Sequence, residues 1–340
     1  MKSIPVLLIS LALCVVTDES LRAQAFRNAG STGAQFLKIG VGARAMGMGG
    51  AYASAAGDAT ALAWNPAGIG TIPGIQLSAE HTSWAVGIDH NFVGLVVPLT
   101  DQVRLGFHTI YLTSGEIEIT TIDNPEGTGQ FYDVADLAVG GTASIKLTTQ
   151  LTLATTIKYI EERIYDVTSG GLALDAGAWY ATGFHSLTLG FMVSNLGLDQ
   201  KFSGRSLEVR YDPAAPGEPP VKAELQALTY SLPLMFRASG SFDLFEAFGE
   251  RLDEHKLIIA MDFIQNADTP ERLAIGTEYT WQNLLSLRAG HLFNADELSW
   301  GAGGGVQLAV SEFRIGVDYA ASSLGRFGLA HRLGISIFYD

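Results

Sequence analysis

The strongest constraint on the fold is a pattern that repeats from about residue 75 to the C-terminus. Apolar side chains alternate with polar or very small ones over the length of a strand, and a turn follows, as in residues 104–108, 188–192 and 314–318. A period of two residues predicts β-strands with one apolar face. Strands that can cross a bilayer at a tilt, each with one apolar face, are the elements of a transmembrane β-barrel.

The N-terminus has the features of a secretory signal peptide. Lys2 supplies a positive charge, residues 4–16 form an apolar run, and Ala23-Gln24-Ala25 offers a cleavage site of small residues. We therefore predict a signal peptide over residues 1–25 and an exported mature chain.

The cysteine content and the net charge narrow the function further. Cys14 raises the alternative of a lipoprotein, but Leu13 stands where a small residue is needed. The mature chain would contain no cysteine, so we expect neither disulfides nor thiol chemistry. The net charge of −14 argues against nucleic acid as a partner. No later apolar run approaches the ~20 residues of a membrane-spanning helix.

Fourteen segments carry the alternating pattern, an even number as single-chain bacterial barrels require. Tight turns join them on one side and longer loops on the other, which is the asymmetry of outer-membrane barrels. One longer connection on the tight-turn side, residues 243–255, carries Phe245, Phe248 and Leu252 at the spacing of a short helix. The expected strands cover residues 75–83, 91–99, 102–113, 134–147, 151–164, 171–181, 186–195, 232–241, 256–264, 271–282, 284–293, 299–310, 312–321 and 331–339.

A soluble β-sandwich would also alternate, but the distribution of side chains favours a membrane barrel. The apolar face often ends in aromatic residues, as at a membrane interface: Tyr111, Tyr159, Tyr180, Tyr279, Trp281, Tyr319 and Tyr339. The opposite face carries charges that a polar lumen accommodates: Arg104, Lys158, Asp175, Arg237, Asp262, Glu278, Arg288, Arg314, Asp318 and Arg332. The last strand resembles the C-terminal sorting signal of such barrels, although Asp340 replaces the usual terminal aromatic residue.

Residues 30–74 do not alternate, and residues 26–74 are predicted to form a plug inside the barrel of residues 75–340. Gly47, Gly49 and Gly50 permit tight turns. Asp58 is expected to cap a short helix over residues 59–64, which Pro66 ends after Asn65. Residues 40–45 could also be a dinucleotide fingerprint, but no βαβ unit surrounds them.

A resemblance to a known family rests on two stretches of this plug. Gly42-Ala43-Arg44-Ala45-Met46-Gly47-Met48-Gly49-Gly50-Ala51-Tyr52 and the later Asn65-Pro66-Ala67-Gly68 resemble the N-terminal hatch of FadL-type barrels. The lead-in Phe36-Leu37-Lys38-Ile39-Gly40-Val41 looks closest to the PorV/PorQ family within that superfamily. The hatch residues singled out are Arg44, Gly47, Gly49, Gly50, Asp58, Asn65 and Pro66.

The resemblance implies an all-β, fourteen-stranded barrel in the bacterial outer membrane, in contact with its lipid. Its PorV/PorQ side implies binding and conveying or anchoring of secreted or surface-attachment proteins in type IX-like secretion. The alternative, implied by the FadL side, is passive transport of long-chain fatty acids or other hydrophobic small molecules. That alternative needs an apolar pocket and a lateral gap in the wall, for which Gly303-Gly304-Gly305 offers a kink.

The sequence offers no enzyme motif. Its seven histidines lack metal-ligand spacing, and no G-x-S-x-G elbow is present. We therefore expect no catalytic residue, no cofactor and no metal, and we interpret His108 and His291 as lumenal or interface residues. A proline-rich segment in the loop 199–230 is the candidate surface for a protein partner. Its residues of interest are Asp212, Pro213, Pro216, Glu218, Pro219 and Pro220.

Overall fold

The computed structural model describes residues 30–211, 221–249, 252 and 254–339. The predicted signal peptide, with Cys14, lies outside these residues. So do the proline-rich candidates of the partner loop: Asp212, Pro213, Pro216, Glu218, Pro219 and Pro220.

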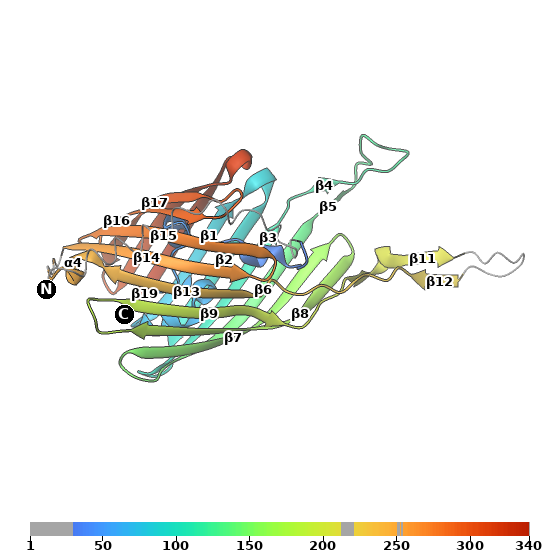
Figure 1. Ribbon diagram of the computed structural model, residues 1–340. Coiled ribbons are helices and arrows are strands. Elements are labelled where there is room, and N and C mark those ends of the chain that lie inside the picture. The colour runs from blue at the N-terminus through green and yellow to red at the C-terminus, as the bar shows by residue number, and fades with distance from the viewer. Residues whose placement is uncertain (1–29, 212–220, 250–251, 253, 340) are drawn as a thin grey trace, which may run out of the picture.

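Within the described residues, fourteen long antiparallel strands close into a barrel (Figure 1). Each strand pairs with its neighbours in the order of the chain, β1 pairs with β19, and pairing of β8 with β9 completes the ring. The strands are β1 (Ile75–Ser83), β2 (Asp89–Pro98), β3 (Val103–Thr113), β6 (Val134–Lys146), β7 (Leu151–Ile164), β8 (Val167–Ala181), β9 (Thr188–Gly197), β13 (Met235–Asp243), β14 (His255–Asn266), β15 (Thr269–Trp281), β16 (Leu285–Phe293), β17 (Trp300–Val310), β18 (Phe313–Ser323) and β19 (Leu329–Tyr339).

All fourteen strands predicted from the alternation are present, with ends that differ by a few residues. The predicted kink at Gly303-Gly304-Gly305 is wrong, because β17 pairs without a register shift with both β16 and β18. Register shifts occur instead between Leu174 and Ala176 and between Ile264 and Asn266. Glycine permits a kink, but the unbroken ladders on both sides keep β17 regular.

The two ends of the barrel differ as predicted, and we name them the turn end and the loop end. The turn end carries tight connections and the short helix α4 (Leu244–Ala247), which the spacing at residues 245–252 had indicated. Two hairpins project from the loop end (Figure 1). One contains β4 (Ile117–Glu118) and β5 (Phe131–Tyr132). The other contains β11 (Glu208–Tyr211) and β12 (Val221–Glu224); it is preceded by β10 (Ser203–Gly204), which pairs with β8, and by η5 (Arg205–Leu207). Single 3-10 turns, η4 (Ala85–Gly87) and η6 (Gly325–Phe327), complete the loop end.

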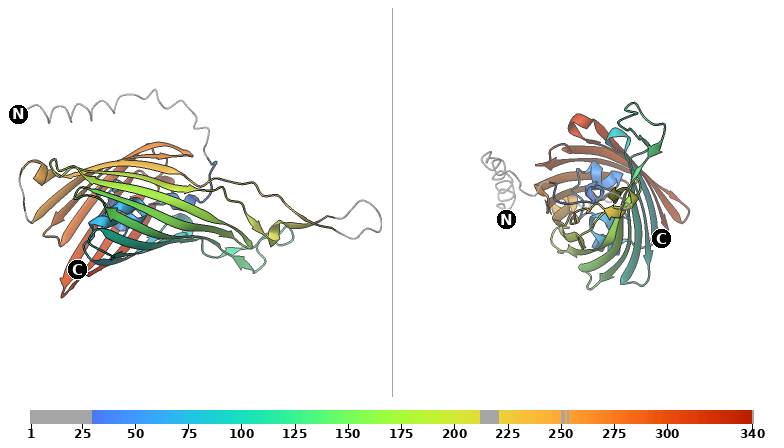
Figure 2. Two further views of the ribbon diagram at one scale, coloured as in Figure 1. Left: turned by 90° about the horizontal axis from the view of Figure 1, so that it is seen from below. Right: turned by 90° about the vertical axis from the view of Figure 1, so that its right-hand side faces the viewer.

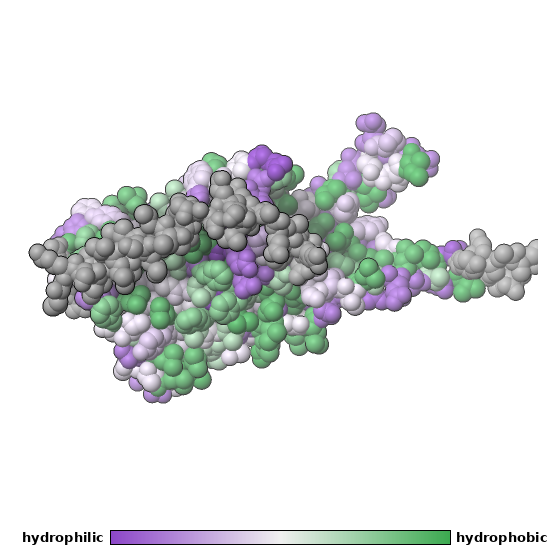
Figure 3. Space-filling model, viewed as in Figure 1, coloured by the Kyte–Doolittle hydropathy of each residue, from purple (hydrophilic) through white to green (hydrophobic). Residues whose placement is uncertain are grey.

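The outer wall is apolar and the inner wall is polar. Large aliphatic and aromatic side chains such as Phe107, Leu172, Leu287 and Ile335 are exposed on the outside. Figure 3 shows apolar patches over the barrel. The charges that the alternation assigned to the lumen are mostly buried, Arg104, Lys158 and Arg332 among them. These are the two faces of a barrel immersed in lipid. In the part of the chain that is described, no helix has the length and hydropathy to span a membrane.

Residues 30–74 run through the barrel interior, and we call them the lumenal segment (Figure 2). The segment contains η2 (Gln35–Lys38), α2 (Ala43–Gly47), α3 (Ala61–Trp64) and η3 (Pro66–Thr71). The predicted helix is shorter than expected and its cap is different. Thr60, not Asp58, is the N-cap residue of α3, and its side chain makes no capping bond. Asp58 does not cap the helix. Its carboxylate accepts hydrogen bonds from the Thr60 amide and hydroxyl and pairs with Arg44.

Glycines of the wall allow this segment to lie against the strands. Gly276, Gly290 and Gly301 stand side by side on β15, β16 and β17. A Cβ at each of them would come within 1.9–2.3 Å of backbone atoms of Met46 or Met48. The wall therefore carries no side chain where the backbone of the lumenal segment touches it.

Candidate functional site

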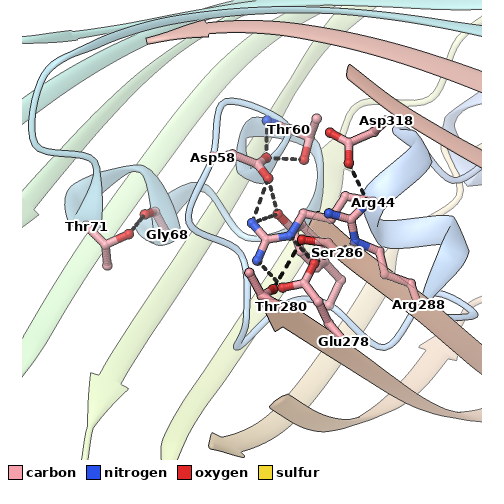
Figure 4. Close-up of polar contacts among 11 residues, drawn as sticks. Arg44, Asp58, Thr60, Gly68, Thr71, Glu278, Thr280, Ser286, Arg288 and Asp318 are labelled. Atoms are coloured by element: carbon pink, nitrogen blue, oxygen red, sulfur yellow. Dashed lines mark hydrogen bonds and ion pairs between the residues drawn. The ribbon is translucent and has the colours of Figure 1, made fainter. Parts of the chain in front are cut away.

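A network of ion pairs centred on Arg44 joins the lumenal segment to the wall (Figure 4). Arg44 lies on α2 and donates two hydrogen bonds to Glu278 of β15, at 2.8 and 2.6 Å. A third bond, of 3.0 Å, runs from Arg44 to Asp58. The paired geometry toward Glu278 is the bidentate arrangement in which guanidinium and carboxylate bind most strongly.

The network continues across the wall through Arg288 of β16. Its Nε donates to Glu278 at 2.6 Å, and its Nη1 donates to Asp318 of β18. Glu278 and Arg288 are directly opposite each other in the β15–β16 ladder. The chain thus brings together residues as distant in sequence as Arg44 and Asp318, because the closed sheet fixes their register.

Asp58 is the second anchor of Arg44 within the lumenal segment. Tyr52 donates its hydroxyl to the Asp58 carboxylate at 2.5 Å, and Thr60 donates both its amide and its hydroxyl. Burial disfavours the ionised carboxyl, but Arg44 and these hydrogen bonds outweigh it and hold the pKa of Asp58 below its ordinary value. Burial also raises the pKa of the Tyr52 phenol well above its ordinary value, so this hydroxyl remains a donor.

A second network holds the glycine-rich turn that follows α2. Arg237 of β13 donates to the Gly50 carbonyl and to Asp262 of β14, both at 2.9 Å. Asp262 also accepts the amides of Tyr52 and Ala53, at 3.2 and 3.1 Å. Asp262 is fully buried, and these partners compensate the loss of its hydration.

Asn65 and Pro66 lie where the predicted end of the helix meets the wall. Asn65 is fully buried, and its amide donates to the carbonyls of Ala53 and Ala178 at 3.1 and 3.0 Å. Its side-chain oxygen accepts the Ala67 amide, so Asn65 caps η3, and Pro66 begins that turn. The residue pair therefore ends α3, starts η3 and ties both to β8.

The remaining motif residues, Gly47, Gly49 and Gly50, lie on the loop-end side of the Arg44 network. Gly49 has φ +65° and would carry a Cβ 2.6 Å from the backbone of Gly290 and His291. Gly50 has φ +83°, and a Cβ on Gly47 would lie 3.3 Å from Arg288. Gly49 is the position where both a left-handed backbone and a close approach to the wall require glycine.

A third anchor fixes the start of the lumenal segment at the loop end. Asp268, between β14 and β15, accepts hydrogen bonds from Thr32 at 2.6 Å, Gln35 at 3.0 Å and Lys38 at 2.9 and 3.0 Å. Burial disfavours its charge, but these bonds outweigh the loss of hydration and lower the pKa of Asp268. Across the mouth, Glu162 of β7 accepts the Ala34 amide at 3.0 Å.

Two adjoining cavities lie between the lumenal segment and the turn end, and together we call them the vestibule. Their volumes are about 240 and 380 Å³, and both are lined by Arg44, Gly57 and Lys256. The first is bounded by charged and polar side chains, with Asp58, Glu80, Glu278, Arg288, Arg314 and Asp318 among them. The vestibule is therefore a polar space, whereas the predicted transporter needed an apolar pocket.

An apolar cavity does occur, but on the outer wall. This outer groove has a volume of about 650 Å³ and is lined almost entirely by apolar surface from β14 to β17. Leu285, Leu287, Tyr279 and Trp281 form its sides and Gly304 part of its floor. Ser286, Gly305 and Val306 line both the outer groove and the vestibule, so only the wall itself separates the two spaces.

The structure brings the predicted motif residues together around the wall, and it adds partners that the sequence did not single out. Glu278, Arg288 and Asp318 were assigned to the lumen without partners, and the anchor Asp268 was missed because a loop aspartate carries no periodic signal. His108 lies in the lumen, stacked on Phe92, and His291 is on the outside. Among the described residues, no group of histidine, cysteine, aspartate or glutamate side chains is arranged to hold a metal.

Comparison with known proteins resolves the fold. No protein-family model matches the sequence, and no curated protein matches it. Among solved structures, the CymD monoaromatic hydrocarbon channel matches with a TM-score of 0.57 and 14% identity over 88% of this chain and 97% of that one. The fold is that of FadL-type outer-membrane barrels.

Two further structures support this assignment. The Ralstonia pickettii toluene transporter TbuX matches with a TM-score of 0.56 and 13% identity, covering 88% of this chain and 97% of that one. A Pseudomonas aeruginosa FadL homologue matches with a TM-score of 0.53 and 14% identity, covering 88% and 98%. These similarities bear out the predicted fold class, and the apolar outer wall fits the predicted place of such a barrel in a bacterial outer membrane. The closer PorV/PorQ relationship stays a prediction.

Proposed function

We propose that this barrel passes hydrophobic small molecules across the outer membrane, by separation of β16 and β17 at a wall that is closed in this structure. The observation that carries the proposal is the outer groove, an apolar cavity of about 650 Å³ that backs onto the vestibule through Ser286, Gly305 and Val306. An apolar cavity with a few polar groups at one end is the usual form of a small-molecule site. The fold shared with channels named for toluene and monoaromatic hydrocarbons agrees with this function.

The lumenal segment has a defined part in this proposal, which is to close the straight path through the barrel. Its side chains from Phe36 to Ile72 form a buried apolar core against the wall. A solute that leaves the vestibule sideways does not have to pass this apolar core. The wall at β17 is thin there, because Gly303, Gly304 and Gly305 place no side chain on either face.

The test is entry of a hydrophobic naphthylamine dye into cells whose outer membrane otherwise excludes it. Cells that make the wild-type barrel are expected to take up the dye faster than cells without it. Gly304→Leu, which fills the outer groove, should reduce that rate. Gly141→Leu, on the outside of β6 where a Cβ would make only an ordinary contact 4.0 Å from Phe107, should not. Uptake equal to that of cells without the barrel would refute the proposal.

A second candidate is the binding of secreted or surface proteins, as in the PorV/PorQ family, and the projecting hairpin β11–β12 favours it. Val209 is opposite Ala223 in this ribbon, while Glu208, Arg210, Lys222 and Glu224 share the other face. Val209 and Val221 are exposed. A two-stranded ribbon is marginally stable alone, so an exposed apolar face beyond the barrel favours a covering partner.

The protein-binding candidate is tested by affinity purification of the tagged barrel from outer membranes in mild detergent, followed by mass spectrometry. Secreted proteins that share a C-terminal domain, or a surface attachment partner, should co-purify with the wild type and be lost from a Val209→Asp, Val221→Asp double variant. Lys222→Gln on the charged face is the matched control. A barrel that purifies without proteins would contradict this function.

A further inference from the structure

We infer that a separate cavity near the loop end, which we call the basic cavity, binds a small inorganic anion such as chloride. The basic cavity lies between the lumenal segment and the wall from β13 to β16, and its volume is about 50 Å³. A buried water requires only ~10–15 Å³ of such volume, so an ion of this size fits. This site is independent of the proposed transport through the wall at β16 and β17.

The lining of the basic cavity carries positive charge. Three cationic side chains line it, namely Lys38, Arg237 and Arg272, and of the described residues around it none is acidic. Apart from Asn266, the rest of its lining is apolar or glycine. Such a space attracts an anion, and the apolar groups strengthen the attraction because they keep water away from the charges.

The register of the sheet brings the two arginines to the same height in the lumen. Arg237 of β13 is opposite Ile264 of β14, and Ile264 is opposite Arg272 of β15. The arginines are thus two strands apart in one inner row, with about 10 Å between their backbones. Just beyond Ile264 the register of β14 and β15 shifts, and such bulges often re-aim side chains beside binding sites. An ion between the two guanidinium groups can contact both.

Nearby carboxylates neutralise two of the three cations. Asp262 pairs with Arg237 at 2.9 Å, and Asp268 pairs with Lys38 at 2.9 Å. Arg272, in contrast, has neither an ion pair nor a hydrogen bond with any residue that the structure describes. One positive charge of the basic cavity is therefore left without a direct partner.

The remaining charges around Arg272 do not supply that partner. Asp296 and Asp268 attract Arg272 only at longer range, and Arg237 repels it. Asp296 and the neighbouring Glu271 are exposed to solvent, which weakens their effect on a group inside the barrel. A guanidinium withdrawn from water without a bound counter-charge is costly, and an anion in the basic cavity would compensate it.

Two buried side chains of the lining provide a second observation for a ligand. Arg237 is 6% exposed and Asn266 is 5% exposed, yet the Arg237 Nε and the Asn266 side-chain oxygen have no hydrogen-bond partner among the described residues. The Asn266 nitrogen donates to the Thr269 hydroxyl at 2.9 Å. Because a hydroxyl can also donate, a half-turn of this amide keeps the contact with Thr269 and frees its N–H groups for an anion. Buried polar groups without partners are costly, so a ligand that accepts from them is favoured.

An anion at this place would stabilise the lumenal segment on the wall. Arg237 donates to the Gly50 carbonyl at 2.9 Å, and its guanidinium lies over the Trp64 ring, 4.6 Å from the ring centroid. Trp64 and Lys38 of the segment also line the basic cavity. An ion held by Arg237 and Arg272 therefore connects β13 and β15 with the glycine-rich turn of the segment.

Heat unfolding of the purified barrel in detergent tests this site, with sodium chloride, sodium bromide and sodium gluconate compared at equal ionic strength. Gluconate is too large for the basic cavity, so the wild-type midpoint should be higher in chloride and in bromide. Arg272→Gln should require about tenfold more chloride for the same rise, because it removes a charged hydrogen-bond donor. Arg272→Lys, which keeps the charge, should require less chloride than Arg272→Gln. Arg326→Gln, which removes an exposed arginine, should respond like the wild type.

Crystals of the wild-type barrel grown with sodium bromide locate the ion by its anomalous scattering. A bromide peak between Arg237 and Arg272, together with the higher midpoint, would support the site, and the peak decides it even where Arg272→Gln does not fold. A cavity without a peak would overturn the inference. A peak with equal wild-type midpoints in all three salts would mark an adventitious ion only and would overturn it as well. So would a chloride effect that Arg272→Gln leaves unchanged, because the ion would then act elsewhere.

Discussion

Replacing Arg44 by methionine should release the lumenal segment from the wall. The change removes three charge-assisted hydrogen bonds, two to Glu278 and one to Asp58, while it keeps most of the side-chain volume. Because the segment occupies the lumen, its detachment would open a path for ions. The expected result is a barrel that conducts far more often than the wild type.

The free-energy cost of Arg44→Met depends on the contacts that Glu278 and Asp58 retain without Arg44. Breaking a buried ion pair by removing one partner costs about 3–5 kcal/mol. Glu278 retains Arg288, Asp58 retains Tyr52 and Thr60, and the Arg44 side chain is 24% exposed, so the low end applies. A cost of about 3 kcal/mol raises the population of barrels with a detached segment by about 100-fold.

Single-channel recording in a planar lipid bilayer measures this population as the frequency and duration of openings. Arg326→Met is the matched control, because Arg326 pairs with Glu297 at the surface, where such pairs contribute at most about 1 kcal/mol. If Arg44→Met opens no more often than Arg326→Met, the ion pairs do not hold the segment, and the reasoning fails.

Three further predictions concern the other anchors, and each is measured as the midpoint of heat unfolding on a gel in detergent. Gly49→Ala should lower the midpoint more than Gly115→Ala, because both positions have φ near +70° but only at Gly49 would the new Cβ strike the backbone of β16; equal losses would dismiss the close approach. Asn65→Ala should lower the free energy of unfolding by about 1–3 kcal/mol for each buried carbonyl that loses its hydrogen bond. An unchanged midpoint would contradict the role of Asn65 as an anchor. Asp268→Asn should destabilise the barrel at neutral pH. The pKa of Asp268 is lower in the folded barrel than in the unfolded chain, so its hydrogen bonds stabilise the fold above the unfolded pKa of ~3.9, and this stabilisation is lost as the pH falls through the folded pKa. The unfolding midpoints of wild type and variant should therefore converge in acid. A difference between the midpoints that does not change with pH would exclude a titrating contact.

The barrel itself was predictable because its main determinant is local. Each strand needs only an apolar face toward lipid and a polar or small face toward the lumen. Because successive side chains point to opposite faces, alternation with a period of two residues shows both faces in the sequence. Connections at the turn end are short, so the order of the strands in the sheet follows the order in the chain. The assignment of Arg237 and Asp262 to the lumen followed from the same parity, and both are buried there.

The site was less predictable because its contacts depend on closure of the sheet. Arg44 and Glu278 are 234 residues apart, and the sequence around either residue does not predict the other as its partner. The helix cap was wrong for a more local reason. Asp58 has the chemistry of a cap, but Arg44 and Tyr52 of the same lumenal segment bind its carboxylate.

The glycines of the wall nevertheless contain part of the missing information. Gly276, Gly290 and Gly301 lie in three different strands, and their sequence spacing means little until the register is known. Once the turns fix that register, the three fall in one lumenal row, and a row without side chains has room for another backbone. That row meets Met46 and Met48, which belong to the same motif that marks the plug. Parity, register and rows of small residues, taken in that order, could therefore locate where a lumenal segment rests on its barrel before any side-chain contact is known.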